Sequence, residues 1–350
     1  MDKKNKSIHG LRGFSAFMVV LAHVYGMSLT AGLISDVGRV YIGTAGVDIF
    51  FMISGFLIFQ SLIKHSKLST FLKNRSLRIY PVFIFIHLVM FATGPMIKYE
   101  WFADINFSRY ILNFFSNLFL LPGIFDLPIA QKNAWSLSYE VLFYIMSAMG
   151  FALAKSTKRK AITIPLLIIL TLCVISVIWF HPRFLFFLIG IGVSYTHSSD
   201  NSHKIVRAIN FSKFSDLLYL SLFIYICEHN VYISLIPAYL FFVSIVTEQG
   251  IISNFLHKKS LQYLGSTSYS LYLWHPFAFF PIRAVFSRLQ LENEYTALTL
   301  FGITGIAIAL FLSHFSYKFI ELWFTNNILK RKSKHLKTRT PDFKLTEPQN

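Results

Sequence analysis

Ten apolar stretches recur along this 350-residue chain, and they constrain its fold more than any other feature. Apolar stretches of this kind are expected to cross a membrane as helices, because hydrocarbon offers no partners to free backbone groups. Charged residues make up only 14% of the chain, against roughly 25% in a soluble domain. We therefore predict an all-α, polytopic transmembrane helix bundle. The expected spans are about 12–31, 44–64, 78–97, 136–154, 162–180, 183–198, 215–229, 230–248, 267–287 and 297–316.

The basic residues indicate how this bundle is oriented. If the N terminus is cytosolic, 26 of the 33 lysines and arginines fall in cytosolic segments, as expected for a membrane protein. The even number of spans then places both termini in the cytosol. Membrane topology therefore explains the net charge of +17, and we expect no nucleic-acid partner. Residues 1–325 are predicted to form one integral membrane domain, and 326–350 a basic, disordered cytosolic tail that lies against membrane lipids.

Three local features complete the expected organisation. The apolar segment 108–121 is too short to span a membrane and is predicted to be an interfacial or re-entrant helix. Cys173 and Cys227 lie inside apolar runs, so we expect neither a disulfide framework nor a metal site. The basic N terminus resembles a signal peptide, but we expect it to be retained because the first span carries a histidine in its middle.

The first span, from Leu11 to Tyr25, holds an arginine and a histidine with informative spacing. Arg12 and His23 are eleven residues apart, which in a helix is roughly 16 Å along the axis and roughly 20° around it. The two side chains therefore share one face, with the histidine near the bilayer midplane. Ionisable groups at that depth indicate function. The alternatives are an arginine that anchors the helix end and a histidine that hydrogen-bonds a neighbouring helix.

The second span contains a carboxylate close to its outer boundary, in the stretch Gly46 to Phe56. Asp48 is costly to bury there unless it is paired or hydrated. Gly55 follows on the same helical face, where a glycine allows a helix or a ligand to approach closely. The alternative interpretation is a packing seam of small residues with Asp48 reaching toward water.

Two arginines lie at the end of the second cytosolic loop, where the third span begins. Arg75 and Arg78 are three residues apart and project to the same side of a helical turn. Two guanidinium groups on one side suit a phosphate or pyrophosphate, because each can bind in a bidentate manner. Taken alone, the pair is better explained as a topology anchor.

Further polar residues enter the fourth, third and ninth spans. Glu140 lies about one turn inside the fourth span, with Tyr144 one turn further on the same face. A carboxylate at this depth could orient a histidine or accept hydrogen bonds from a sugar, or simply face water. His87 and His275 lie at depths similar to that of His23, so periodicity does not select one catalytic histidine. At the end of the last span, Lys318 and Glu321 could pair with each other.

Taken together, these stretches resemble the acyltransferase family 3 of integral membrane O-acyltransferases, which acetylate O-antigen and other bacterial surface polysaccharides. Five motifs occur in the family's order over about three quarters of the chain. They are Arg12 with His23, the stretch Gly46 to Phe56 that includes Ser54, Arg75 to Pro81, Trp135 to Tyr144, and Ser268 to Pro276. One departure is that Glu321-Leu322-Trp323 stands where members often have Glu-Arg-Pro, which weakens any role for Glu321.

The resemblance implies transfer of an acyl group, usually acetyl, from cytosolic acyl-CoA to a sugar hydroxyl, in the bacterial inner (plasma) membrane. Acetyl-CoA is then the expected donor, and a lipid-linked or exported carbohydrate the acceptor. The resemblance makes His23, Asp48 and Glu140 the expected catalytic residues. His23 would act as general base or carry a transient acetyl group, while Asp48 or Glu140 orients the imidazole or the acceptor. The expected substrate-binding residues are Arg12, Arg75, Arg78, Ser54, Tyr144 and His275.

Two other classes of protein remain open from the residues. In a transporter or flippase, His23, Asp48 and Glu140 would form a proton or substrate path. A glycan polymerase is also polytopic and also acts on lipid-linked sugars. The cytosolic arginine pair favours acyl transfer, because acyl-CoA requires an anion site there and ion-coupled transport does not.

Overall fold

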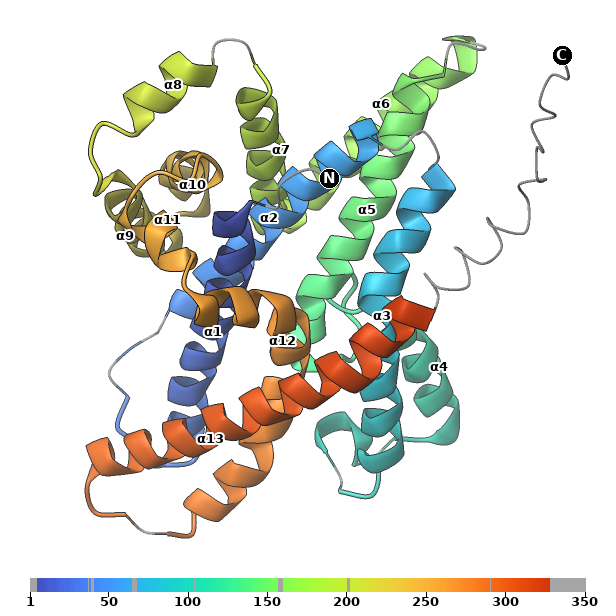
Figure 1. Cartoon of the computed structure of the whole chain (residues 1–350). Helices are drawn as coiled ribbons and strands as arrows, with labels where there is room; N and C mark the ends of the chain where they lie inside the picture. The colour runs from blue at the N-terminus through green and yellow to red at the C-terminus, as the bar shows by residue number, and fades with distance from the viewer. Residues whose placement is uncertain are drawn as a thin grey trace, which may run out of the picture.

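The computed structural model describes residues 5–36, 38, 41–64, 68–97, 99–103, 105–156, 160–199, 202–289 and 291–327. Within these ranges the chain is helical and contains no β-strand, which confirms the all-α prediction (Figure 1). The α-helices are α1 (Lys6–Thr30), α2 (Ile42–Lys64), α3 (Leu68–Thr93), α4 (Phe107–Leu118), α5 (Trp135–Ala154), α6 (Lys160–Phe180), α7 (Leu185–His197), α8 (Ser202–Ile209), α9 (Ser215–His229), α10 (Val231–Val246), α11 (Ile251–Leu256), α12 (Lys259–Phe286) and α13 (Glu294–Ser316). Short helical turns are η1 (Glu100–Phe102), η2 (Lys132–Ala134), η3 (Pro182–Phe184) and the π-helical η4 (Tyr317–Glu321).

Each of the ten expected spans coincides with a helix, although not all of these helices are long and apolar enough to cross a membrane. Among the described residues, six helical segments are long and apolar enough to cross a membrane. They are Lys6–Thr30, Ile42–Lys64, Leu68–Thr93, Lys132–Ala154, Lys160–Phe180 and Glu294–Asn327. The chain is therefore a multi-pass membrane protein. Helices α7, α9 and α10 have 13, 15 and 16 residues. At about 1.5 Å per residue they are shorter than a hydrocarbon core of about 30 Å.

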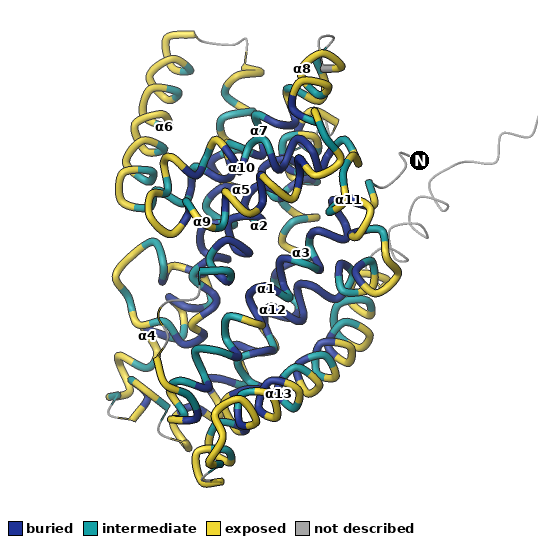
Figure 2. Tube along the Cα trace, turned by 90° about the vertical axis from the view of Figure 1, so that its left-hand side faces the viewer, coloured by how far each residue is buried: buried dark blue, intermediate teal, exposed yellow. Residues whose placement is uncertain are grey.

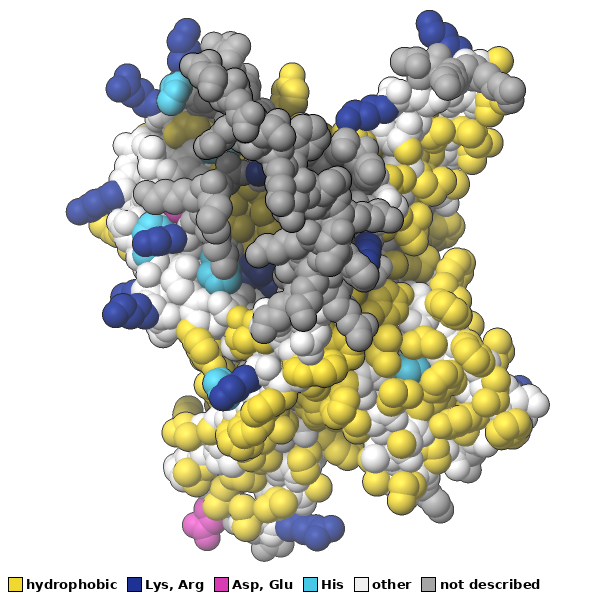
Figure 3. All heavy atoms as spheres, turned by 45° about the vertical axis from the view of Figure 1, so that its right-hand side comes forward, with side chains coloured by type: hydrophobic (Ala, Val, Ile, Leu, Met, Phe, Trp, Pro, Cys, Tyr) yellow, Lys and Arg dark blue, Asp and Glu magenta, His cyan; other side chains and the backbone are white. Residues whose placement is uncertain are grey.

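Helix α1 lies at the centre of the bundle and packs against α2, α12 and α13. Figure 2 shows buried backbone along α1 and α12, whereas α6 runs along the outside. None of the residues 160–180 of α6 is buried, as expected for a helix that faces lipid. Hydrophobic side chains cover much of the side seen in Figure 3, with Lys and Arg side chains gathered mainly toward its upper part. This distribution agrees with a bundle that stands in a membrane.

The bundle has two ends that matter for the site. At one end α1 begins and α2, α7 and α10 end; we call it the inner end, following the predicted orientation. At the other end α1 and α3 end and α5 begins; we call it the outer end. Arg12 lies near the inner end of α1, and His23 lies closer to its outer end.

Glycines set how closely the central helices approach. A methyl group on Gly55 of α2 would stand 2.0 Å from the carbonyl oxygen of Phe187 in α7, and one on Gly190 would stand 2.1 Å from that of Met52. The same relation joins α1 and α12, where a methyl group on Gly13 would lie 2.5 Å from the Gly265 nitrogen. Gly55 therefore serves helix packing, which was one of the two interpretations of its sequence context.

Replacing Gly55 by alanine is expected to destabilise the fold by about 1–3 kcal/mol, because the added methyl overpacks the seam between α2 and α7. The control is Gly26→Ala in α1, where nothing lies within 4 Å of the added methyl and helix propensity favours alanine by up to about 1 kcal/mol. The measurement is the thermal unfolding midpoint of each detergent-purified protein, followed by tryptophan fluorescence. Equal midpoints for the two variants would contradict this account of the seam.

The structure extends the third helix beyond the expected boundary. Helix α3 begins at Leu68, about ten residues before the predicted start, so Arg75 and Arg78 lie within the helix and not in a loop. Pro81 sits inside α3 and removes one backbone donor, which the helix tolerates. Segment 108–121 contains the expected short helix, α4. The predicted tail lies outside the described residues from 328 onward.

Candidate functional site

A wide vestibule opens at the inner end of the bundle. Its volume is about 590 Å³, and the start of α1 and the ends of α2, α7 and α10 line it. His9, Arg12, Lys64 and His197 contribute nitrogen groups to this wall. The vestibule therefore offers cationic and hydrogen-bonding groups to an anionic ligand that approaches from the inner end.

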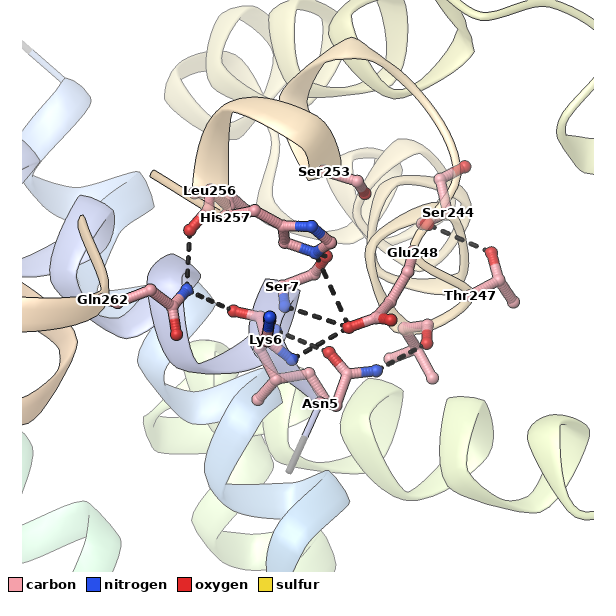
Figure 4. Close-up of polar contacts among 12 residues, drawn as sticks. Asn5, Lys6, Ser7, Ser244, Thr247, Glu248, Ser253, Leu256, His257 and Gln262 are labelled. Atoms are coloured by element: carbon pink, nitrogen blue, oxygen red, sulfur yellow. Dashed lines mark hydrogen bonds and ion pairs between the residues drawn. The ribbon is translucent and has the colours of Figure 1, made fainter. Parts of the chain in front are cut away.

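A polar network fastens the inner end of α1 (Figure 4). The Asn5 side chain caps the helix by accepting from the amide of Ile8, and it donates to the carbonyl of Val246 at 2.8 Å. Glu248 accepts from the backbone amides of Lys6 and Ser7 at 2.9 and 3.3 Å. A carboxylate at a helix N terminus also interacts favourably with the helix dipole. The network fixes the position of the helix that carries Arg12 and His23.

Arg12 stands at the junction of two cavities. It lines the vestibule, and it also lines a smaller central cavity of about 50 Å³ bounded by Ser54, Arg78 and Glu140. The guanidinium group of Arg12 interacts electrostatically with three charged side chains, those of Arg78, Glu321 and Glu140. Its Nε atom is buried and has no hydrogen-bond partner among the described residues. An anion that passed from the vestibule toward the central cavity would meet Arg12 at the boundary between them.

The guanidinium group of Arg75 contacts two aromatic rings near Arg78 and Glu140. Its guanidinium lies 5.5 Å from the ring centre of Phe71 and 5.8 Å from that of Tyr144, at distances where cation–π attraction is effective. The predicted arginines therefore gather at one place. Arg12, Arg75 and Arg78 outnumber the two carboxylates, Glu140 and Glu321, by one positive charge, which favours an anionic ligand. We define these five residues as the arginine cluster.

Glu140 belongs to this cluster and not to the neighbourhood of His23. Its Oε1 accepts from the Ser54 hydroxyl at 2.7 Å and from the Tyr144 hydroxyl in a short hydrogen bond. Three predicted site residues, Ser54, Glu140 and Tyr144, therefore contact one another across α2 and α5. The carboxylate is held by two hydroxyl donors beside the arginines, where it can orient their side chains.

His23 faces a third cavity at the outer end. This outer pocket has a volume of about 150 Å³, and α1, α3, α12 and the chain before α5 line it. The Nδ1 atom of His23 lies 2.9 Å from the carbonyl oxygen of Val19. Because a carbonyl only accepts, Nδ1 carries the proton in the neutral ring and Nε2 is left as a base. The backbone of α1, rather than Asp48 or Glu140, orients this imidazole.

His275 contacts His23 directly. The ring centres are 4.6 Å apart in an edge-to-face arrangement with an interplanar angle of 72°. His275 is fully buried, its Nδ1 bonds the carbonyl of Leu271 at 3.2 Å, and its Nε2 has no partner among the described residues. The structure thus joins two of the three candidate histidines into one pair, of which His23 is the member that lines the pocket.

His87 lies elsewhere. It packs between the rings of Phe91 and Phe114, with centres 4.6 and 4.7 Å away, and it lines none of the three cavities described above. Its surroundings are those of a core residue. Of the three candidate catalytic histidines, His87 is therefore the one whose packing favours a structural role.

Asp48 is fully buried at a distinct position. Its carboxylate forms an ion pair with Arg183 and accepts from the thiol of Cys227 at 3.2 Å. It lines none of the three cavities. These contacts tie α2 to η3 and α9. The predicted catalytic role of Asp48 stays a prediction, while its contacts favour a structural one, because removing one partner of a buried pair costs about 3–5 kcal/mol.

Glu321 lies in the arginine cluster, although its sequence context weakened any role for it. Its carboxylate accepts from Ser270 at 3.2 Å and acts on Arg12, while Lys318 lies over the ring of Phe319. Both residues belong to η4, whose π-helical turn changes the spacing of side chains around the helix. Glu321 therefore interacts with Ser270 and Arg12 rather than with Lys318.

A family model described as an acyltransferase domain matches residues 5–314. The chain belongs to the acyltransferase 3 family. The part of the chain that matches the family model includes the vestibule, the arginine cluster except Glu321, and the histidine pair. The resemblance inferred from the five motifs is thereby confirmed.

Two curated relatives show how far this likeness extends. "O-acetyltransferase OatA" of Staphylococcus aureus (strain NCTC 8325 / PS 47) is 26% identical over 356 residues, which cover 90% of this chain and 56% of the relative. "Putative peptidoglycan O-acetyltransferase YrhL" of Bacillus subtilis (strain 168) is 24% identical over 368 residues, covering 90% of this chain and 54% of the relative. This acyltransferase 3 chain thus spans little more than half the length of these relatives. No solved structure matches it significantly.

Proposed function

We propose that this protein transfers an acyl group, acetyl in the first instance, from cytosolic acyl-CoA to a hydroxyl group of a cell-surface or lipid-linked glycan. One observation carries the proposal: a single helix, α1, presents Arg12 to the inner cavities and His23 to the outer pocket. The two relatives, named for O-acetyl transfer and in one case for peptidoglycan, support the acyl group and the acceptor class.

The donor would enter through the vestibule. Its anionic head would bind among the basic groups of the vestibule wall, with Arg12 at the inner boundary of the central cavity. The extended arm of the donor would run along α1, where roughly 16 Å separates Arg12 from His23. The arginine cluster then holds the donor by charge, while Glu140 keeps the guanidinium groups in place.

The acceptor would reach His23 from the outer pocket. The Nε2 atom of His23 takes the proton of the acceptor hydroxyl as that oxygen attacks the thioester carbonyl carbon. The tetrahedral intermediate then collapses, the carbon–sulfur bond breaks, and the proton on His23 returns to the leaving thiolate of CoA. His275, packed against the ring of His23, would hold it in the attacking orientation. A transient acetyl-histidine is the second route with the same residues.

In living cells, the chain is expected to add an ester to surface polysaccharide. The test measures O-acetyl groups by proton NMR and mass spectrometry in cells that make the wild-type chain, the His23→Ala variant, or neither. We expect the ester signal with the wild-type chain alone, at equal amounts of membrane protein and unchanged glycan length. An unchanged ester signal together with altered glycan length or amount would overturn the proposal and favour the flippase or polymerase interpretation.

A further inference from the structure

The outer pocket contains features that the transfer chemistry described above does not use. Beside His23, its wall combines aromatic rings, Tyr99, Phe277 and Phe280, with the polar side chains of Thr93 and Lys132. A pocket that is mostly apolar with a few polar groups fixes the orientation of a small ligand. Flat apolar faces alternating with hydrogen-bonding groups match a sugar ring, which has C–H faces and a rim of hydroxyls.

The wall of this pocket is held in place by contacts from several elements. The rings of Tyr99 and Phe280 pack edge to face, with centres 5.3 Å apart. Lys132 forms an ion pair with Glu100 at 2.6 Å. The indole of Trp101 donates to the carbonyl of Ile129 at 3.0 Å, which fixes the irregular chain that leads into η2. The pocket is therefore built before any ligand arrives.

Two amides join this irregular chain to α12 just before Pro276. Asn133 donates to the carbonyl of Tyr272 in a short hydrogen bond, and Gln131 donates to the carbonyl of Leu273 at 3.1 Å. Pro276 has no N–H, so the carbonyl of Tyr272, four residues earlier, has lost its helical donor. Asn133 supplies the missing donor. We define the side chains of Gln131 and Asn133 as the amide clamp.

The amide clamp bonds the part of α12 that lies next to the wall of the outer pocket. The hydroxyl of Tyr272 donates back to the carbonyl of Asn133 at 3.0 Å, so the two segments are bonded in both directions. His275, which contacts His23, lies between Tyr272 and the proline. The clamp therefore sets both the wall of the pocket and the position of the histidine pair.

We propose that the outer pocket binds one sugar ring of the glycan acceptor, and that the amide clamp is the positioning element of this subsite. The inference rests on the proposed acyl transfer and adds where the acceptor lies. The ring would pack against Tyr99, Phe277 and Phe280 and present a hydroxyl to His23. Gln131 and Asn133 act through the backbone of α12 and are positioning residues.

The test separates acceptor binding from donor binding. Purified protein is given labelled acyl-CoA and de-O-acetylated glycan from the cells that express it, and transfer to glycan and to water are both measured. For Asn133→Ala we expect the KM for glycan to rise by about tenfold or more, with the KM for acyl-CoA unchanged. The control, Asn210→Ala, removes a half-buried amide bonded to Thr247 and Ser244 and should leave both KM values unchanged.

A second variant guards against misfolding of the first. Thr93 is exposed at the rim of the pocket, so Thr93→Trp should fill the pocket without disturbing the core. We expect it to lower transfer to glycan at least tenfold while hydrolysis of acyl-CoA continues. Unchanged transfer to glycan by Thr93→Trp, or an equal loss of hydrolysis and transfer, would overturn the subsite. A wild-type protein that transfers nothing from acyl-CoA to glycan would instead overturn the proposed function itself.

Discussion

Replacing His23 by alanine is expected to lower kcat for acyl transfer by about 10²–10⁴-fold, the range typical of a lost general base. The reason is geometric: the bond from Nδ1 to Val19 leaves Nε2 unprotonated, and His23 lines the outer pocket. The measurement is steady-state transfer from labelled acyl-CoA to glycan by purified protein in lipid nanodiscs, with folding checked by size exclusion.

The other two histidines provide matched controls for this effect. His87→Ala removes the same group from a pocket of phenylalanine rings and should leave kcat within a few-fold of wild type. His275→Ala should lower kcat less than His23→Ala does, because His275 is buried and acts through the ring of His23. A loss in His87→Ala as large as that in His23→Ala would refute the assignment of the base.

Replacing Arg12 by alanine is expected to lower kcat/KM for acyl-CoA by about 30-fold or more. Truncating one partner of a buried, hydrogen-bonded charge pair typically costs about 2–5 kcal/mol, and about 1.36 kcal/mol corresponds to a tenfold change. Arg12 carries this effect because it lines both the vestibule and the central cavity and has an Nε atom without a partner among the described residues.

A conservative variant and a distant one make this expectation specific. Arg12→Lys keeps the charge but loses the planar fork, so it should recover part of the activity. Arg288→Ala removes an exposed arginine from the outer side and should change neither KM. If Arg12→Ala left the KM for acyl-CoA unchanged and raised only the KM for glycan, the proposed direction of donor entry would be wrong.

Much of the fold follows from local patterns in the sequence. Each expected span coincides with a helix, because the length and hydropathy of a segment belong to that segment alone. The shared face of Arg12 and His23 follows from eleven residues of helical spacing within α1. The boundaries were less predictable: α3 begins at Leu68, since basic residues such as Arg75 and Arg78 can continue a helix out of the membrane.

The candidate site was predictable in its residues but not in its groupings. The motifs identified Ser54, Glu140 and Tyr144, and the structure brings them into direct contact. They did not indicate that Asp48 pairs with Arg183, which the sequence presented only as a charge near the outer boundary. Asn133 carried no signal at all, because its role depends on the donor that Pro276 removes from a helix far along the chain.

The sequence by itself determined the all-helical membrane class, the helix that carries Arg12 and His23, and the family. These properties depend on composition and on spacing within single segments. Only the tertiary structure decided that His275 and not His87 joins His23, that Glu140 and Glu321 gather with the arginines, and that three cavities lie along α1. Such contacts join segments far apart in the chain, and close packing of helix faces, which no local pattern encodes, selects among them.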